Sequence, residues 1–373
     1  MIHTTHVPHK ATLPAGHRAN RCKADELNEA YKLHHLFETH SCKVREASKP
    51  QIQPGQRQLF DSAELETKKT WLAAMGGDNQ KAMLKILEKL TVAGSYRTVA
   101  QAPDPAVLDT LLQDFPNFDS VTKVIQKHLL LCRLGPEKLL KIPAILLDGP
   151  PGVGKTAYCH RLAKLFGTRF EQIDLSSGGA NFSMTGLDSG YGSGHPGRIF
   201  ESLQHGSMSV LWQLDEVDKC RTEGSHTGNQ YLLGLLEPAT AVRFIDNAAL
   251  VPLNASWVLY IATSNDKTNI DAPLRSRFEV FDIPTPDAKQ LQAIVKSIHC
   301  GILESEPWAK TFDANLDDAL IEALGNCSPR EIRRQLIDAY ATAASQGRNR
   351  LLAKDVVIQA KAAEENERRI GFV

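Results

Sequence analysis

The sequence predicts an α/β protein with a parallel sheet, followed by a separate helical unit. A glycine-rich loop, Gly149 to Thr156, stands between the apolar run Ile145 to Leu147 and a helix-forming stretch that ends at Phe166. From Phe115 onward short apolar segments alternate with helical ones, and after Pro284 only helical segments follow. Such alternation is typical of a parallel sheet that helices cover on both faces.

Five apolar segments are the expected strands of that sheet. They run from Ile145 to Asp148, Phe170 to Asp174, Val210 to Asp215, Val258 to Ser264 and Phe278 to Ile283. Each is short and bounded by polar or turn-forming residues, as buried strands are. Sheets of this kind bind ligands at the carboxyl ends of their strands. The glycine-rich loop, Asp215 and Ser264-Asn265 all follow strand ends, so we expect them to meet.

The chain divides into four expected regions. Residues 1–60 are poor in aliphatic side chains and predict a flexible arm, in which Ala24 to Phe37 could form one amphipathic helix. Residues 61–117 predict a small helical segment from Leu65 to Val99 and a linker at Gln101 to Pro105. Residues 118–285 hold the α/β domain, and residues 286–373 predict a helical lid and tail. The lid helices are expected at Asp287 to Ser297, Leu316 to Leu324, Ser328 to Ser345 and Ala353 to Glu367.

Histidines gather in the predicted arm, where positions 3, 6, 9, 17, 34, 35 and 40 hold seven of the thirteen in the chain. That clustering suggests a metal site, but the arm lacks the C-x-x-C or H-x₃-H spacing of structural zinc sites. We therefore favour a solvated arm, or a segment that orders when a partner binds.

Composition points to a globular protein, with 42% hydrophobic and 23% charged residues among 373. Lys+Arg and Asp+Glu both number 43, so no net charge favours nucleic acid or anionic lipid. The seven cysteines show no paired spacing, which suits reduced thiols. Met1 to Asn20 has no apolar signal core and no long apolar run follows, so we expect a cytoplasmic protein without a membrane partner.

The glycine-rich loop has the full G-x-x-x-x-G-K-[ST] pattern of a phosphate-binding loop. In this pattern the backbone N–H groups point at the phosphates, the lysine reaches the β and γ oxygens, and the hydroxyl ligates Mg²⁺. The pattern predicts ATP and Mg²⁺ as ligands, with Lys155 on the phosphates and Thr156 on the metal. The cradle itself consists of Gly149, Pro150, Pro151, Gly152, Val153 and Gly154.

Acidic and neutral polar residues follow the later strands. Asp215 is expected to hold the metal and Glu216 to polarise the attacking water. Within that strand only Gln213 interrupts the apolar run. Asn265, after the next strand, could orient the water, and Arg277 could neutralise charge on the transferred phosphoryl group.

The loop, the Asp215-Glu216 strand, the Ser264-Asn265 strand and Arg275-Ser276-Arg277-Phe278, in this order, resemble the AAA+ ATPase family. The similarity is greatest to the ATPase module of Lon protease, over roughly residues 118–345. It implies a three-layer sandwich with a five-stranded parallel sheet, a helical lid, and a ring of six subunits with ATP bound between neighbours. Arg277 matches the arginine that acts on the adjacent subunit's ATP, with Arg275 as the second candidate.

The resemblance assigns two further residues. Arg330 matches a lid arginine that contacts the nucleotide within its own subunit. Tyr191 stands where Lon-type loops carry an aromatic residue that grips an extended polypeptide in the pore. The aliphatic residue usual after the tyrosine is replaced by Gly192, which weakens this expectation.

One departure from Lon limits what is carried over. Lon has a peptidase domain after the lid, whereas few residues follow the lid here, so we expect no peptidase activity of its own. The expected function is a Mg²⁺-dependent, ring-forming ATPase that remodels or threads a protein substrate. Two alternatives are a nucleic-acid motor or loader, which the balanced charge disfavours, and a nucleotide-dependent conformational switch.

Overall fold

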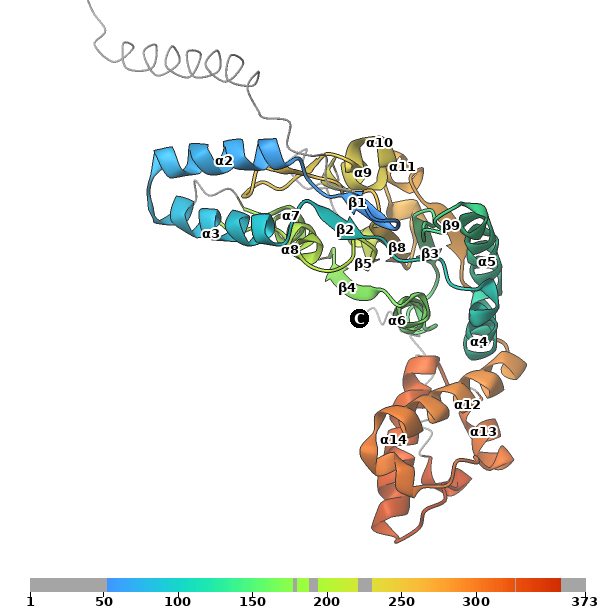
Figure 1. Cartoon of the computed structure of the whole chain (residues 1–373). Coiled ribbons are helices and arrows are strands. Elements are labelled where there is room, and N and C mark those ends of the chain that lie inside the picture. The colour runs from blue at the N-terminus through green and yellow to red at the C-terminus, as the bar shows by residue number, and fades with distance from the viewer. Residues whose placement is uncertain (1–51, 177–179, 188–193, 221–229, 326, 357–373) are drawn as a thin grey trace, which may run out of the picture. The chain divides into compact units, whose positions relative to one another are not determined.

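The computed structural model describes residues 52–176, 180–187, 194–220, 230–325 and 327–356. A five-stranded sheet lies at its centre, in the order β4-β5-β8-β3-β9, and all neighbouring strands are parallel (Figure 1). The strands are β3 (Ile145–Asp148), β4 (Arg169–Asp174), β5 (Val210–Asp215), β8 (Leu259–Ser264) and β9 (Glu279–Asp282). The prediction of an α/β fold with a five-stranded parallel sheet is therefore confirmed.

Two buried layers enclose the sheet because successive side chains of a strand face opposite sides. Ile145 and Leu147 pack with α6 (Lys155–Phe166) and α5 (Asp119–Leu134). Leu146 faces the other side, where α8 (Arg198–Gln204) packs. Helices therefore cover both faces, as the strand composition predicts. The short helices α7 (Ala180–Thr185), α9 (Gln230–Leu236), α10 (Pro238–Ala241) and α11 (Ala272–Arg275) complete the domain, with a hairpin of β6 (Phe244–Ile245) and β7 (Pro252–Leu253).

A helical hairpin precedes this domain and shares its core. Helices α2 (Ser62–Met75) and α3 (Asp78–Val92) lie side by side (Figure 1). They meet at Gly76 and Gly77, whose φ angles of 66° and 100° favour glycine. Their buried side chains, among them Leu72 and Leu87, belong to the same apolar cluster as Trp212 of β5.

Two segments of this region differ from their expected character. Residues 56–58, within the predicted arm, form β1 (Gln56–Gln58), which pairs antiparallel with β2 (Tyr96–Thr98). Both strands are polar and only three residues long, so the sequence shows no alternation of apolar residues that would predict them. The expected linker at 101–105 is also anchored, since Ala102 N donates to Lys138 O at 2.7 Å and Leu140 N to Ala100 O at 2.8 Å. The turn η2 (Pro105–Leu108), α4 (Asp109–Asp114) and η3 (Pro116–Phe118) then lead into α5.

The helical unit after the sheet has its own buried core. It contains α12 (Ala288–Ser305), η6 (Pro307–Thr311), α13 (Asp318–Leu324) and α14 (Pro329–Ser345), packed around residues such as Leu320 and Leu336 (Figure 1). Helix α12 extends eight residues beyond the predicted end at Ser297. Of the helix expected from Ala353, the described part shows only a 3₁₀ turn, η7 (Ala353–Asp355). The unit contacts the α/β domain where Ser297 Oγ donates to Asp114 Oδ1 at 2.9 Å.

No helix among the described residues is long and apolar enough to cross a bilayer. Residues 1–51, which include the clustered histidines, lie outside the described part of the chain.

Candidate nucleotide site

The phosphate loop joins β3 to α6 in a conformation that depends on glycine. Gly152 and Gly154 have φ angles of 84° and 105°, in the region that L side chains rarely adopt. Gly149 passes so close to the end of β9 that an added Cβ would lie 2.3 Å from Ile283 O. Its own N–H donates to Ser264 O, at the end of β8, at 3.2 Å. The loop is thereby held against the carboxyl ends of β8 and β9, the two strands that flank β3.

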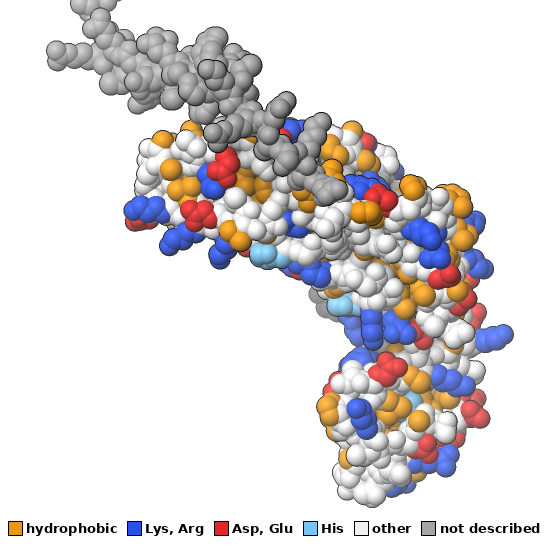
Figure 2. Space-filling model, in the orientation of Figure 1, with side chains coloured by type: hydrophobic (Ala, Val, Ile, Leu, Met, Phe, Trp, Pro, Cys, Tyr) orange, Lys and Arg blue, Asp and Glu red, His pale blue; other side chains and the backbone are white. Residues whose placement is uncertain are grey.

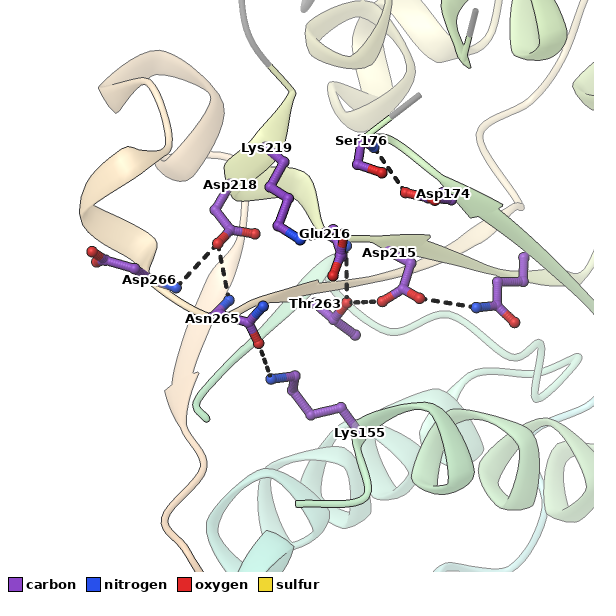
Figure 3. Close-up of polar contacts among 11 residues, drawn as sticks. Lys155, Asp174, Ser176, Asp215, Glu216, Asp218, Lys219, Thr263, Asn265 and Asp266 are labelled. Atoms are coloured by element: carbon purple, nitrogen blue, oxygen red, sulfur yellow. Dashed lines mark hydrogen bonds and ion pairs between the residues drawn. The ribbon is translucent and has the colours of Figure 1, made fainter. Parts of the chain in front are cut away.

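Lys155 is the first residue of α6, so its side chain and the free N–H groups of that helix end are close together. Lys155 Nζ donates to Gly149 O and to Pro150 O, the latter at 3.2 Å. It also donates to Asn265 Oδ1 at 3.1 Å (Figure 3). The ammonium group thus rests on carbonyl and amide oxygens of the site. Burial lowers the pKa of Lys155 from its usual value, although the carboxylates of Asp148 and Asp218 act in the opposite direction.

Asp215 ends β5 and accepts hydrogen bonds from both neighbouring strands. Thr263 Oγ1, on β8, donates to Asp215 Oδ1, and Gln172 Nε2, on β4, donates to Asp215 Oδ2 at 3.0 Å (Figure 3). The hydroxyl of Thr263 also accepts from Glu216 N at 3.2 Å. One threonine therefore fixes the carboxylate of Asp215 and the backbone of Glu216 together.

Glu216 has φ 55° and ψ 46°, a left-handed conformation that is uncommon outside glycine. Its carboxylate pairs with Lys219 Nζ at 2.7 Å. Strained backbone of this kind concentrates at functional sites, where surrounding contacts hold it. Here the left-handed conformation of Glu216 turns the chain sharply after Asp215. The carboxyl group of Glu216 therefore does not point to the opposite face of the sheet, as the next residue of a strand would.

Asp218 is a residue whose role the sequence pattern did not reveal. Its Oδ2 accepts from Asn265 N at 3.1 Å and Asp266 N at 3.2 Å, tying the turn after β5 to the turn after β8 (Figure 3). The sequence also shows no sign of the roles of Thr263 and Gln172. Each donates a hydrogen bond to Asp215 from a neighbouring strand, and no sequence motif links these positions. The strand register, in which Asp174 pairs with Asp215, supplies that information.

The donor set suits Mg²⁺. Magnesium binds hard oxygen ligands and takes only one or two carboxylates from the protein, with the rest supplied by phosphates and water. Thr156 Oγ1 and Asp215 provide such oxygens, and Gln213 Nε2 donates to the Thr156 hydroxyl at 3.1 Å. Among the described residues no cluster of three or more His, Cys, Asp or Glu forms a ready-made metal cage. A site of this type therefore depends on the bound nucleotide for its remaining ligands.

The two candidate arginines lie after β8. Arg277 follows α11 and forms an ion pair with Glu237, and its side chain is 40% exposed. Arg275 Nη1 donates to Lys267 O at 3.1 Å. The hydrogen bonds and ion pairs of Arg277 within the described residues do not reach the phosphate loop or Asp215.

Arg330 is exposed on the first turn of α14, whose N-terminus lies beside the phosphate loop. A Cβ added at Gly152 would lie 3.7 Å from the Ser328 side chain, which caps α14. Tyr191 lies outside the described residues. The chain on either side of its loop is joined by the Leu187–His195 bridge, in which Leu187 N donates to His195 O at 2.9 Å.

The fold and these contacts define a phosphate-loop domain of the class that binds and hydrolyses nucleoside triphosphates. Residues 145–283 match the family described as "ATPase family associated with various cellular activities (AAA)". This segment of the chain is thus similar to AAA ATPase domains, as the motif order predicts, and the match supports an ATPase.

Relatives of the chain include Lon proteases. The Lon protease of Desulfovibrio desulfuricans is 30% identical over 211 residues, which are 56% of this chain and 24% of that protein. The Lon protease of Chloroherpeton thalassium is 28% identical over 269 residues, 70% of this chain and 31% of that protein. The chain therefore spans about a quarter to a third of the length of these relatives. The Thermotoga maritima RuvB Holliday junction branch migration motor aligns with 64% of this chain and 66% of its own at 18% identity, with a TM-score of 0.41.

Proposed function

We propose that residues 118–345 bind ATP with Mg²⁺ and hydrolyse it to ADP and phosphate. The observation that carries this proposal is the 3.1 Å contact between Lys155 Nζ and Asn265 Oδ1. It brings the start of α6 and the end of β8 to one point, beside the β5 carboxylates. A γ-phosphate placed there would replace the amide and carbonyl oxygens around the ammonium group.

Each side chain then has a defined task. Lys155 and the loop N–H groups hold the phosphates, while Thr156 and Asp215 hold Mg²⁺, which supplies positive charge against the phosphate oxygens. Glu216 leaves Lys219 and accepts a hydrogen bond from the attacking water. Asn265 fixes the direction of that water, and Arg330 contacts the nucleotide from α14.

A complete site requires a second copy of the chain. Arg277 is paired with Glu237 and makes no polar contact with the phosphate loop among the described residues. An exposed arginine of this kind can act on ATP bound to a neighbouring subunit, as the similarity to Lon ATPase modules implies. We therefore propose a ring, with six subunits as the expected number.

The proposed work of the ring is the remodelling of a protein substrate, with Tyr191 as the gripping residue. A nucleic-acid motor is the less favoured function. Over α2 and α3 basic and acidic side chains lie beside each other (Figure 2), and Lys69–Glu66 and Lys81–Asp78 pair at 2.9 Å and 3.3 Å. Nucleic-acid surfaces carry unpaired positive charge along one face. A conformational switch with slow turnover is the remaining alternative.

The test of hydrolysis is Glu216→Gln, with Glu88→Gln on α3 as the matched control. The first variant should retain ATP binding and lose turnover by about 10²-fold or more, because it removes the base for the attacking water. The control should hydrolyse ATP at the normal rate. Normal turnover in Glu216→Gln would remove Glu216 from the mechanism. Stimulation of turnover by unfolded protein, and not by DNA, would support the proposed substrate class.

A further inference from the structure

Gln213 occupies the middle of β5, where every other side chain from Val210 to Leu214 is apolar. Its side chain is fully buried, with an exposed fraction of 0%. It shares its side of the strand with Leu211, which packs in the same apolar layer as Cys159 and Leu162 of α6. An amide in this layer is out of place unless it has a polar partner.

One end of the amide has a partner and the other does not. Gln213 Nε2 donates to Thr156 Oγ1 at 3.1 Å. Gln213 Oε1 is buried and accepts no hydrogen bond in the described part of the chain. A buried carbonyl oxygen without a donor destabilises the fold, and a methionine or leucine here would avoid that cost. The chain keeps an amide at this position despite that cost.

The neighbouring strand carries a second glutamine in register. Gln172 of β4 pairs with Gln213 of β5, so both side chains lie on the same face of the sheet. Gln172 Nε2 donates to Asp215 Oδ2 at 3.0 Å. Each of the two side chains expected to hold Mg²⁺, Thr156 and Asp215, is therefore hydrogen-bonded to its own glutamine.

We infer that Gln213 is a positioning residue that orients the Thr156 hydroxyl toward the magnesium ion. This inference rests on the proposed function and adds a residue to it. A hydroxyl that ligates a metal keeps its proton and becomes a stronger donor. Rotation of the Gln213 amide by half a turn would present Oε1, now without a donor, as the acceptor for that proton. The lone pairs of Thr156 Oγ1 would then face the metal, and the neutral amide would leave the charge of the site unchanged.

The experiment compares Gln213→Met with Gln335→Met. Methionine has nearly the length of glutamine and makes no comparable hydrogen bond. Gln335 of α14 is a matched control, because it is also buried, at 7% exposure, and its Oε1 also lacks a donor in the described residues. ADP affinity of each full-length protein is measured by calorimetry in excess Mg²⁺ and in excess EDTA. The ratio of the two affinities reports the contribution of the metal.

The ratio should fall about 10- to 100-fold in Gln213→Met, the usual loss when a partner of a metal ligand is removed. ADP affinity in EDTA should stay at the wild-type value, and the melting temperature should stay level or rise. Gln335→Met should keep the wild-type ratio. A purely structural role for Gln213 would instead lower the melting temperature and leave the ratio unchanged.

An unchanged ratio in Gln213→Met would overturn the inference. If Gln213→Met does not fold, Gln213→Leu is measured in the same way. Failure of both to fold would show that Gln213 is kept for the fold, which also overturns the inference. The proposed function fails separately, when the wild-type protein binds no nucleotide or shows no gain in affinity from Mg²⁺.

Discussion

The ion pair between Arg277 and Glu237 sets up a competition that can be measured. If Arg277 acts on the neighbour's ATP, it must first leave Glu237. The ion pair therefore lowers the fraction of molecules in which Arg277 is free to act. The side chains are 40% and 35% exposed, so water and salt screen the attraction strongly. Exposed pairs of this kind contribute about 0.2–1 kcal/mol. Release of Arg277 by Glu237→Gln should therefore raise ATPase turnover by about 1.5- to 5-fold.

Turnover is measured by phosphate release at protein concentrations where light scattering shows the same assembly for each variant. Glu64→Gln is the control, because it breaks an exposed ion pair with Arg243, of 3.1 Å, away from the site. The gain in Glu237→Gln should shrink as salt rises, since the screening length falls to about 3 Å at 1 M. Arg277→Ala should abolish turnover in both backgrounds, by about 10³-fold. Slower hydrolysis in Glu237→Gln, or full activity in Arg277→Ala, would refute the competition.

Two further predictions concern the fold. Gly149→Ala should destabilise the protein by about 1–3 kcal/mol in urea unfolding, because its Cβ would lie 2.3 Å from Ile283 O. The control is Gly301→Ala on α12, where an added Cβ meets no atom within 4 Å, and it should be neutral or stabilising. Equal effects of the two substitutions would contradict the close approach at Gly149. Burial lowers the pKa of His299 below its usual 6.5, so the unfolded chain binds the proton more readily and stability should fall as pH drops below about 6.5. His299→Gln should flatten this dependence in thermal melts, and an unchanged slope would show that other groups cause it.

The strand ends could be predicted from the sequence because a change of chemistry marks each of them. β3 and β5 have the predicted bounds, since each apolar run stops at an aspartate, Asp148 and Asp215. The helix after the phosphate loop ends at Phe166, as predicted, where Gly167 follows in a left-handed conformation. The lid helix was predicted to end at Ser297, although α12 continues to Ser305 through Gly301, a residue of low helix propensity.

The supporting contacts of the site could not be predicted, because they join positions far apart in sequence. Asp218 accepts a hydrogen bond from the backbone N–H of Asn265. Thr263, on the neighbouring strand β8, bonds to both the carboxylate of Asp215 and the backbone N–H of Glu216. The unusual character of Gln213 was visible as an interruption in an apolar run. Its partner, Thr156, follows only from the packing of α6 on β5.

The common core of the helical hairpin and the sheet has a practical consequence for dissecting this protein. A fragment that begins at the first strand of the sheet would lack Leu72 and Leu87, which belong to the same buried apolar cluster as Trp212, and would expose part of that cluster to water. Such a fragment would aggregate rather than report on catalysis, and a protease should release no intact hairpin from the native chain. Shortened versions for biochemistry therefore need to start ahead of residue 56, where β1 begins.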